Sequence, residues 1–200
     1  MKSSKKVYRL TLIAILSALA ALLMFLQLPL PFAPSFMKLD IAELPALFAS
    51  FYLGPLSGFA VVILKIILKL ALKGTSTAFV GEIMNVICGC VYTGIAGYLY
   101  QKNHTRKGAL LGLCLSTLCV SLVAAALNAV MIFPMYAKMY GMPMDAIIGM
   151  VSKVNSLVSD YRTAMIFAVF PFNLIKFAVT SLFTYLMYKR TGNALRELVR

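Results

Sequence analysis

Long apolar runs, separated by short polar or glycine- and proline-containing stretches, dominate this 200-residue chain. A helix needs roughly 20 apolar residues to cross the hydrocarbon core of a bilayer, so each run is a candidate membrane-spanning helix. The second run is short and contains Glu43 and Pro45, which also fits a re-entrant segment. The pattern predicts an all-α, polytopic membrane protein with a single membrane domain over residues 1–200. Its six spans are expected near residues 10–29, 41–53, 56–72, 80–100, 109–135 and 162–188.

The composition agrees with a lipid-embedded chain. Hydrophobic residues make up 62% of it and the mean hydropathy is +0.90, whereas an average soluble domain is about 45–50% apolar. The apolar stretch after the basic N-terminus is too long for the hydrophobic core of a signal peptide, so we interpret it as a retained first span. The longest polar stretch, residues 136–161, is expected to form an external segment with some helix of its own.

The distribution of lysine and arginine predicts the orientation. Cytoplasmic segments of membrane proteins are enriched in these residues. If both termini are cytoplasmic, the inner segments hold 11 of the 19 basic residues, with Glu197 the one acid among them. The net charge of +13 is then a topology signal that also attracts anionic membrane lipid. We expect no nucleic-acid partner, because the charges lie at the ends of spans and not on one basic face. The inner basic residues are Lys2, Lys5, Lys6, Arg9, Lys102, Arg106, Lys107, Lys189, Arg190, Arg196 and Arg200.

Polar residues within the apolar runs collect in the predicted outer half of the bundle. A charged residue in hydrocarbon costs about 2.5–3.5 kcal/mol even on lenient insertion scales, so several on one side indicate a shared cavity that opens to the outside. Asn173 and Lys176 are three residues apart and share a helix face, as do Glu82 and Asn85. In the simpler alternative, Lys65, Lys69 and Lys176 pair with acids or reach the membrane surface for structural reasons, and Asn128 joins two helices. The candidate binding residues are Asp40, Glu82, Asn85, Asn128, Asn173 and Lys176.

The residue types in this group indicate the chemistry of a ligand. An asparagine side chain presents a donor beside an acceptor, which suits a flat heterocycle with alternating N–H and C=O groups. Carboxylates suit hydroxyl groups. Four phenylalanines, Phe36, Phe79, Phe133 and Phe172, are available to cover an aromatic ring, although ordinary packing or lipid contact explains each of them as well. The residues alone therefore predict an uncharged, partly aromatic, hydroxylated small molecule.

The sequence offers no catalytic or metal-binding pattern. The single histidine, His104, lies in an inner loop, far from the polar group described above. The four cysteines lie in apolar segments without the spacing of a zinc site, so inert thiols are expected. No phosphate-binding loop for a nucleotide is present, so any ATP must be used by another chain. We expect neither an enzyme nor a protein with a bound cofactor.

Three segments carry a resemblance to a known family. They are "MKLDIAELPALFASFYLGPLSGFAVVILKIILKL" (37–70), "GTSTAFVGEIMNVICG" (74–89) and "NLIK" (173–176). Together with the six-helix pattern, they make the chain similar to the riboflavin-specific S component of energy-coupling-factor vitamin transporters. The resemblance implies that riboflavin is the transported substrate in a prokaryotic plasma membrane. It also implies a transmembrane coupling subunit and two ATP-binding subunits as partners, and toppling of the S component to deliver the vitamin.

The resemblance also implies roles for residues. The loop at residues 31–40, which contains Asp40, matches the family's gate over the flavin. Glu82, Asn85, Asn128, Asn173 and Lys176 match the family's polar contacts, and Ala14 and Ala18 match its small-residue coupling surface on the first helix. Ile66 stands after Lys65 where relatives often have a polar residue, so the role of Lys65 stays open. The alternatives are an S component for another vitamin, a ligand-free membrane assembly factor and, least favoured, an intramembrane enzyme.

Overall fold

The computed structural model describes residues 2–30, 37–75 and 77–199, and the side chains of residues 5–30, 37–75, 77–139 and 141–188. Helices make up most of the described chain. The helices are α1 (Lys2–Leu23), α2 (Leu44–Leu53), α3 (Pro55–Lys73), α4 (Val80–Lys102), α5 (Arg106–Leu127), α6 (Phe133–Tyr140), α7 (Met144–Ser152), α8 (Tyr161–Ala164) and α9 (Phe170–Val199), with π-helical turns η1 (Asn128–Ile132) and η2 (Met165–Val169). Two short strands, β1 (Leu28–Pro29) and β2 (Lys38–Leu39), pair antiparallel.

Five helical stretches in the described residues are long and apolar enough to cross a membrane. They are Lys5–Leu23, Pro55–Lys73, Val80–Lys102, Arg106–Met139 and Tyr161–Tyr188. The prediction of an all-α, multi-pass membrane protein is therefore confirmed. The second predicted span, residues 41–53, is the helix α2 of ten residues. At 1.5 Å per residue α2 is about 15 Å long, half of the ~30 Å hydrocarbon core.

The first helix differs from its predicted bounds. It was expected over residues 10–29, but α1 begins at Lys2 and ends at Leu23, and the apolar residues after it leave the helix. Pro29 disfavours helical geometry in the residue before it. Leu28 and Pro29 instead pair with Leu39 and Lys38. The other predicted spans coincide with α3, α4, the α5–η1–α6 run and the α8–η2–α9 run.

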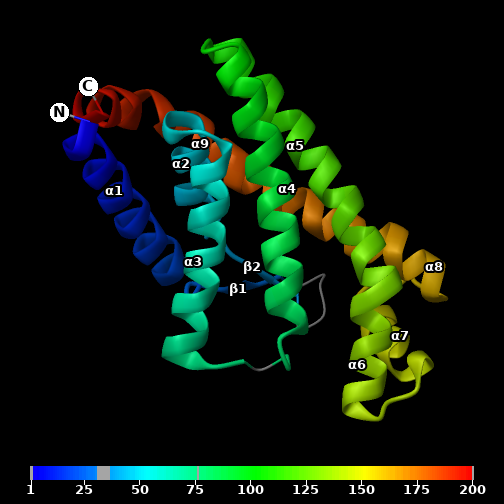
Figure 1. The fold of residues 1–200 in the computed structure, drawn as a ribbon. Helices are drawn as coiled ribbons and strands as arrows, with labels where there is room; N and C mark the ends of the chain where they lie inside the picture. Colours follow the sequence, from blue (N-terminus) through cyan, green and yellow to red (C-terminus); the bar gives the residue numbers. More distant parts are fainter. Residues whose placement is uncertain (1, 31–36, 76, 200) are drawn as a thin grey trace.

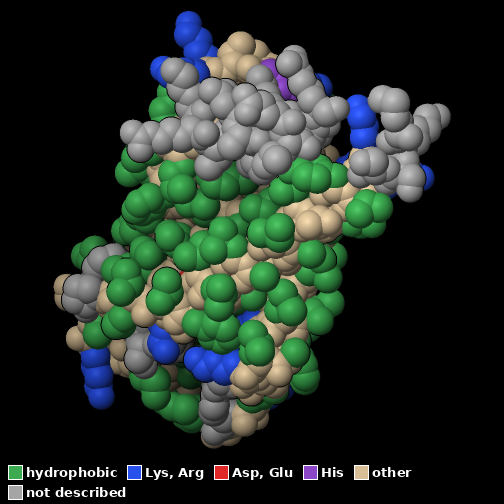
Figure 2. Space-filling model, turned by 90° about the vertical axis from the view of Figure 1, so that its left-hand side faces the viewer, with side chains coloured by type: hydrophobic (Ala, Val, Ile, Leu, Met, Phe, Trp, Pro, Cys, Tyr) green, Lys and Arg blue, Asp and Glu red, His purple; other side chains and the backbone are tan. Residues whose placement is uncertain are grey.

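The helices form a bundle with two different ends (Figure 1). The start of α1, the end of α9 and the α4–α5 connection lie at one end. The two strands, the α3–α4 connection and the helices α6 and α7 lie at the opposite end. In the middle of the face that carries α1, apolar side chains cover the surface, while Lys and Arg side chains lie toward the two ends (Figure 2). This distribution suits a protein whose middle part contacts lipid tails while its two ends contact the lipid head groups.

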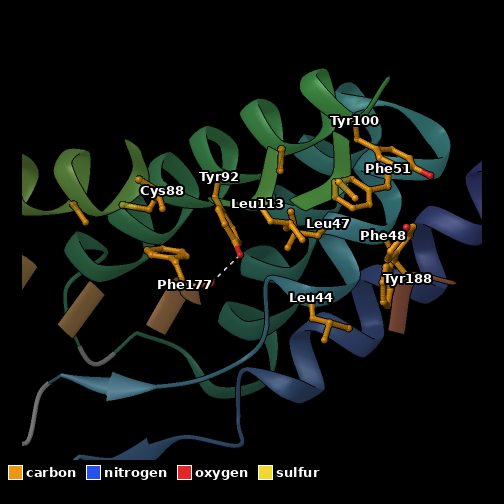
Figure 3. Close-up of a cluster of buried hydrophobic side chains, with 14 residues drawn as sticks. Leu44, Leu47, Phe48, Phe51, Cys88, Tyr92, Tyr100, Leu113, Phe177 and Tyr188 are labelled. Atoms are coloured by element: carbon orange, nitrogen blue, oxygen red, sulfur yellow. Dashed lines mark hydrogen bonds between the residues drawn. The ribbon is translucent and has the colours of Figure 1, made fainter. Parts of the chain in front are cut away.

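An aromatic core fills the bundle on the side of the termini, between α2, α4, α5 and α9 (Figure 3). Tyr92 is fully buried there, and its hydroxyl donates to the Phe177 carbonyl at 3.0 Å. Glycines allow the helices to approach closely. A Cβ atom on Gly97 of α4 would lie 1.8 Å from the Ser50 hydroxyl oxygen of α2. The bundle is thus closed by tight packing toward the end that holds the termini.

Candidate functional site

A cavity of about 770 Å³ lies toward the other end of the bundle. This volume falls within the ~300–1,000 Å³ usual for small-molecule sites. Its wall comes from the segment around β2, the α3–α4 connection, α4, the α5–η1 run and α9. All six candidate binding residues from the sequence line it, namely Asp40, Glu82, Asn85, Asn128, Asn173 and Lys176. The structure therefore brings together side chains that lie up to 136 positions apart in the chain.

The predicted gate loop, residues 31–40, is described in part. Residues 31–36, with Phe36, lie outside the described residues, whereas Met37, Lys38 and Asp40 line the cavity. Of the other predicted phenylalanines, Phe172 lines the cavity. Phe133 is fully buried in a hydrophobic cluster beside the cavity and does not line it, and the side chain of Phe79 is 55% exposed. Neither Phe79 nor Phe133 lines the cavity, so the alternative given with the prediction, ordinary packing or surface contact, accounts for both.

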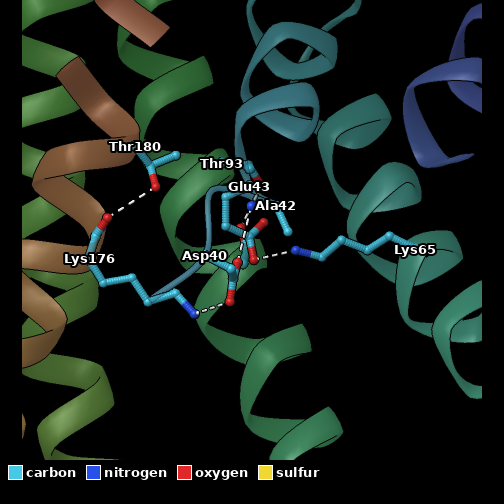
Figure 4. A network of polar contacts seen from close by, with 8 residues as sticks. Asp40, Ala42, Glu43, Lys65, Thr93, Lys176 and Thr180 are labelled. Carbon is cyan, nitrogen blue, oxygen red and sulfur yellow. Dashed lines mark hydrogen bonds and ion pairs between the residues drawn. The ribbon is translucent and has the colours of Figure 1, made fainter. Parts of the chain in front are cut away.

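Asp40 and Lys176 form an ion pair at the cavity wall (Figure 4). Asp40 lies directly after β2 and Lys176 lies on α9. The Lys176 Nζ donates to Asp40 Oδ2 at 2.9 Å, and the Ala42 amide donates to Oδ1 at 3.1 Å. Burial raises the pKa of the Asp40 carboxyl, but the nearby ammonium groups and these hydrogen bonds outweigh it and hold the pKa below its usual value. A lysine ammonium has three donors, so Lys176 retains donors for a ligand.

Glu82 sits in the first turn of α4, where the helix dipole favours a negative charge. It pairs with Lys69 of α3. Its other oxygen, Oε2, accepts hydrogen bonds from the hydroxyls of Thr75 at 3.1 Å and Thr77 at 2.7 Å. The acids of the cavity are thus both paired with lysines, as the simpler alternative from the sequence anticipated, and both pairs line the cavity.

The three asparagines differ in how many hydrogen bonds each side-chain amide makes within the protein. Asn128 donates from Nδ2 to the Ala124 carbonyl at 2.7 Å, and Asn173 donates to the Val169 carbonyl at 2.8 Å. Within the described residues, neither Oδ1 atom accepts a hydrogen bond, and the Asn85 side chain makes none. Because buried amides are normally satisfied, these groups form a polar patch suited to the edge of a heterocycle.

Two π-helical turns position Asn128 and Asn173. Asn128 is the first residue of η1, and Asn173 follows η2 by four positions. A proline comes shortly after each turn, Pro134 and Pro171. Proline lacks the amide hydrogen that would bond to a carbonyl in the preceding turn, and π-helical turns frequently occur at functional sites. The two prolines are the sequence signal that these helices change their hydrogen bonding here, a feature that the apolar pattern alone does not predict.

Side chains satisfy carbonyls within the two turns. The Tyr161 hydroxyl donates to the Ala129 carbonyl in η1. Asn155 Nδ2 donates at 2.8 Å to the carbonyl of Phe167 in η2, which lies four residues before Pro171. These bonds stabilise the irregular backbone that aims two amides at the cavity.

Further lining residues were not predicted. Phe25 and Phe177 add aromatic surface, and Lys73, which also lines the cavity, holds its ammonium 5.7 Å from the centre of the Phe25 ring. Methionines contribute much of the apolar wall. They have flexible, polarisable side chains that adapt to the shape of a ligand. They are Met24, Met37, Met84, Met142 and Met150.

Ala14 and Ala18, the predicted coupling residues, do not line this cavity. Both are exposed on α1, while Leu12, Leu16 and Ala20 of the same helix are buried against the bundle. The two alanines therefore lie on the side of α1 that is free to meet lipid or another helix.

The comparison with known proteins identifies the family. The model for the substrate-specific component of ECF transporters matches residues 8–188. The chain belongs to this family. It is therefore a transport component and not an enzyme, as the sequence predicted, and it is a multi-pass protein of the cell membrane.

Similar proteins include three curated riboflavin transporters and a solved structure. The chain is 33% identical over 191 residues to the riboflavin transporter RibU of Streptococcus thermophilus, covering 95% of this chain and 85% of that one. It is 30% identical over 188 residues to the riboflavin transporter FmnP of Bacillus subtilis, covering 92% of each. RibU of Staphylococcus aureus is 28% identical over 190 residues, covering 95% of this chain and 93% of that one. The S component of a bacterial ECF transporter superposes with a TM-score of 0.72 at 29% identity, covering 94% of this chain and 96% of that one.

Proposed function

We propose that this chain is the riboflavin-binding subunit of an ECF transporter and that it captures riboflavin from outside the cell in the cavity described above. The observation that carries the proposal is the convergence of all six candidate residues on one cavity of about 770 Å³. The riboflavin transporters among its relatives support the choice of vitamin.

The contacts follow from the chemistry of each side chain. Asn128 and Asn173 pair with the pyrimidine edge of the flavin, which alternates N–H and C=O groups. Lys176 donates to a ring carbonyl. Phe172 and the methionines cover the faces of the aromatic ring. Asp40, Glu82 and Asn85 remain for the hydroxyl groups of the ribityl chain.

The proposed topology has six crossings and cytoplasmic termini. The short helix α2 and the segment before it together make the second crossing. The ends of α1 and α9 lie on one side of the bundle (Figure 1), and the excess of Lys and Arg in the segments at that side supports a cytoplasmic location. The cavity then faces outward.

Energy comes from partners in this proposal. A transmembrane coupling subunit contacts α1 at Ala14 and Ala18, because small residues four apart let a second helix approach closely. Two ATP-binding subunits complete the transporter, since the sequence has no nucleotide-binding loop of its own. Riboflavin moves inward when this subunit is coupled to them.

The decisive experiment is a riboflavin titration of the detergent-purified protein, followed by quenching of flavin fluorescence. We expect saturable binding at one site per chain, and a yellow preparation where vitamin co-purifies. A protein that binds another vitamin and leaves added riboflavin free would refute the choice of substrate. In liposomes without partners, the protein should bind riboflavin without accumulating it against a gradient, and uphill uptake there would overturn the role of partners.

A further inference from the structure

A third ion pair lies behind the cavity wall. Glu43 comes directly before α2 and pairs with Lys65 of α3. The residues are 5% and 1% exposed, and neither lines the cavity. A buried ion pair loses so much hydration that it seldom adds net stability. Its presence in this position therefore calls for another explanation.

This pair and the Asp40–Lys176 pair form a row across the bundle (Figure 4). Lys176 of α9 pairs with Asp40, and Lys65 of α3 pairs with Glu43, while the two acids lie three positions apart in one short segment. The row holds two negative and two positive charges. The two pairs also interact electrostatically with each other: Lys65 attracts Asp40, and Glu43 attracts Lys176.

Helix α4 limits what else can reach Glu43. A Cβ atom on Gly89 would lie 3.0 and 3.1 Å from the two carboxylate oxygens, so the α4 backbone packs directly against them. The oxygen Oε2 is buried and has no hydrogen-bond partner among the described residues. Lys65 is therefore the cation that balances Glu43, and Lys176 is the next cation in the row.

We infer that Lys65 is a positioning residue for the ligand site, because its charge keeps Glu43 from drawing the Lys176 ammonium away from the cavity wall. The inference rests on the proposed riboflavin site. Without the Lys65 charge, two acids would share Lys176, and in surroundings of low polarity such an attraction is barely screened. The ammonium would then turn from the cavity toward Glu43, and the ligand would lose a donor.

The test substitutes the lysine and then restores charge balance. Lys65→Met keeps an unbranched side chain, one heavy atom shorter, and removes its charge. We expect riboflavin affinity to fall about three- to a hundredfold, the range seen for coupled residues of one ion-pair network. The double variant Lys65→Met/Glu43→Gln has no extra acid, so its affinity should return to within about threefold of the wild type. If Lys65→Met fails to fold, Lys65→Gln replaces it in the test. This variant keeps a polar head group without the charge, and it should weaken riboflavin binding as well.

The readouts separate positioning from stability. Affinity comes from flavin titration, the surroundings of the bound flavin from its visible absorption band, and stability from the melting temperature without ligand. Wild-type affinity in Lys65→Met or Lys65→Gln would overturn the inference and leave the proposed function intact. A double variant as weak as Lys65→Met would also overturn it, because the role would then be structural. A wild-type protein that binds no riboflavin would instead refute the proposed function, and the inference with it.

Discussion

Asn128→Ala tests the polar patch of the cavity most directly. Asn128 is 6% exposed and lies at the first residue of η1, where its Nδ2 donates to the Ala124 carbonyl. That bond stays within one helical run. Alanine favours helix, so the substitution should change the stability of the ligand-free protein by only about 0.5–1.5 kcal/mol, the usual net value of one hydrogen bond.

The effect on binding should be larger. An amide has two donors and accepting lone pairs on its oxygen, and the intrahelical bond of Asn128 uses one donor. Its Nδ2 also donates to the Met84 sulfur, a weak acceptor, at 3.5 Å, and Asn128 lines the cavity, where its Oδ1 accepts no hydrogen bond among the described residues. A polar ligand group left without its partner in a buried site costs about 1–3 kcal/mol. Since 1.4 kcal/mol is a factor of ten, we expect the dissociation constant for riboflavin to rise about ten- to a hundredfold.

The assay is the quenching of riboflavin fluorescence by purified protein. Asn103→Ala is the matched control, because Asn103 is exposed at the α4–α5 connection, at the opposite end of the bundle. It should bind riboflavin as the wild type does. If Asn128→Ala also binds with wild-type affinity, the assignment of this amide to the flavin is wrong.

Three other substitutions test separate parts of the structure. Lys176→Met leaves buried Asp40 without its partner and should lower stability by about 3 kcal/mol; adding Asp40→Asn should restore the melting temperature but not riboflavin affinity. Gly97→Ala forces a Cβ atom against Ser50 and should destabilise the bundle by about 2–3 kcal/mol, with partial recovery on adding Ser50→Ala; an unchanged melting temperature would contradict the close packing. Ala18→Leu should preserve binding while lowering riboflavin uptake in cells about tenfold, and full uptake would exclude this face of α1 from coupling.

The polar residues of the site were predictable because they stand out in apolar runs. Glu82 and Lys176 are charged residues within apolar runs, where contact with lipid tails is unfavourable. Their positions along the predicted spans place both toward the same end of the bundle. Their partners were not predictable. Glu43 was noted as an anomaly of the second run, but its pairing with Lys65 depends on how α2 and α3 pack, which hydropathy does not encode.

The irregular helices show a similar limit. The apolar run near residues 109–135 predicts a helix, and the α5–η1–α6 run confirms it, but the pattern does not distinguish a π-helical turn from an ordinary one. Pro134 indicates only that the hydrogen-bond ladder must change. The sequence does not show which carbonyl lacks a helical hydrogen bond. That the Tyr161 hydroxyl donates to one of them depends on contacts between distant segments.

The short length of α2 also bears on how the chain enters the membrane during synthesis. A helix of ten residues is too short to be inserted by itself as a span, so we expect α2 and α3 to enter together as a hairpin folded at Gly54, whose φ of 100° favours glycine. Glu43 and Lys65 face each other across that hairpin. In such a hairpin, the paired acid and base would enter the bilayer as a neutral unit before α9 is made.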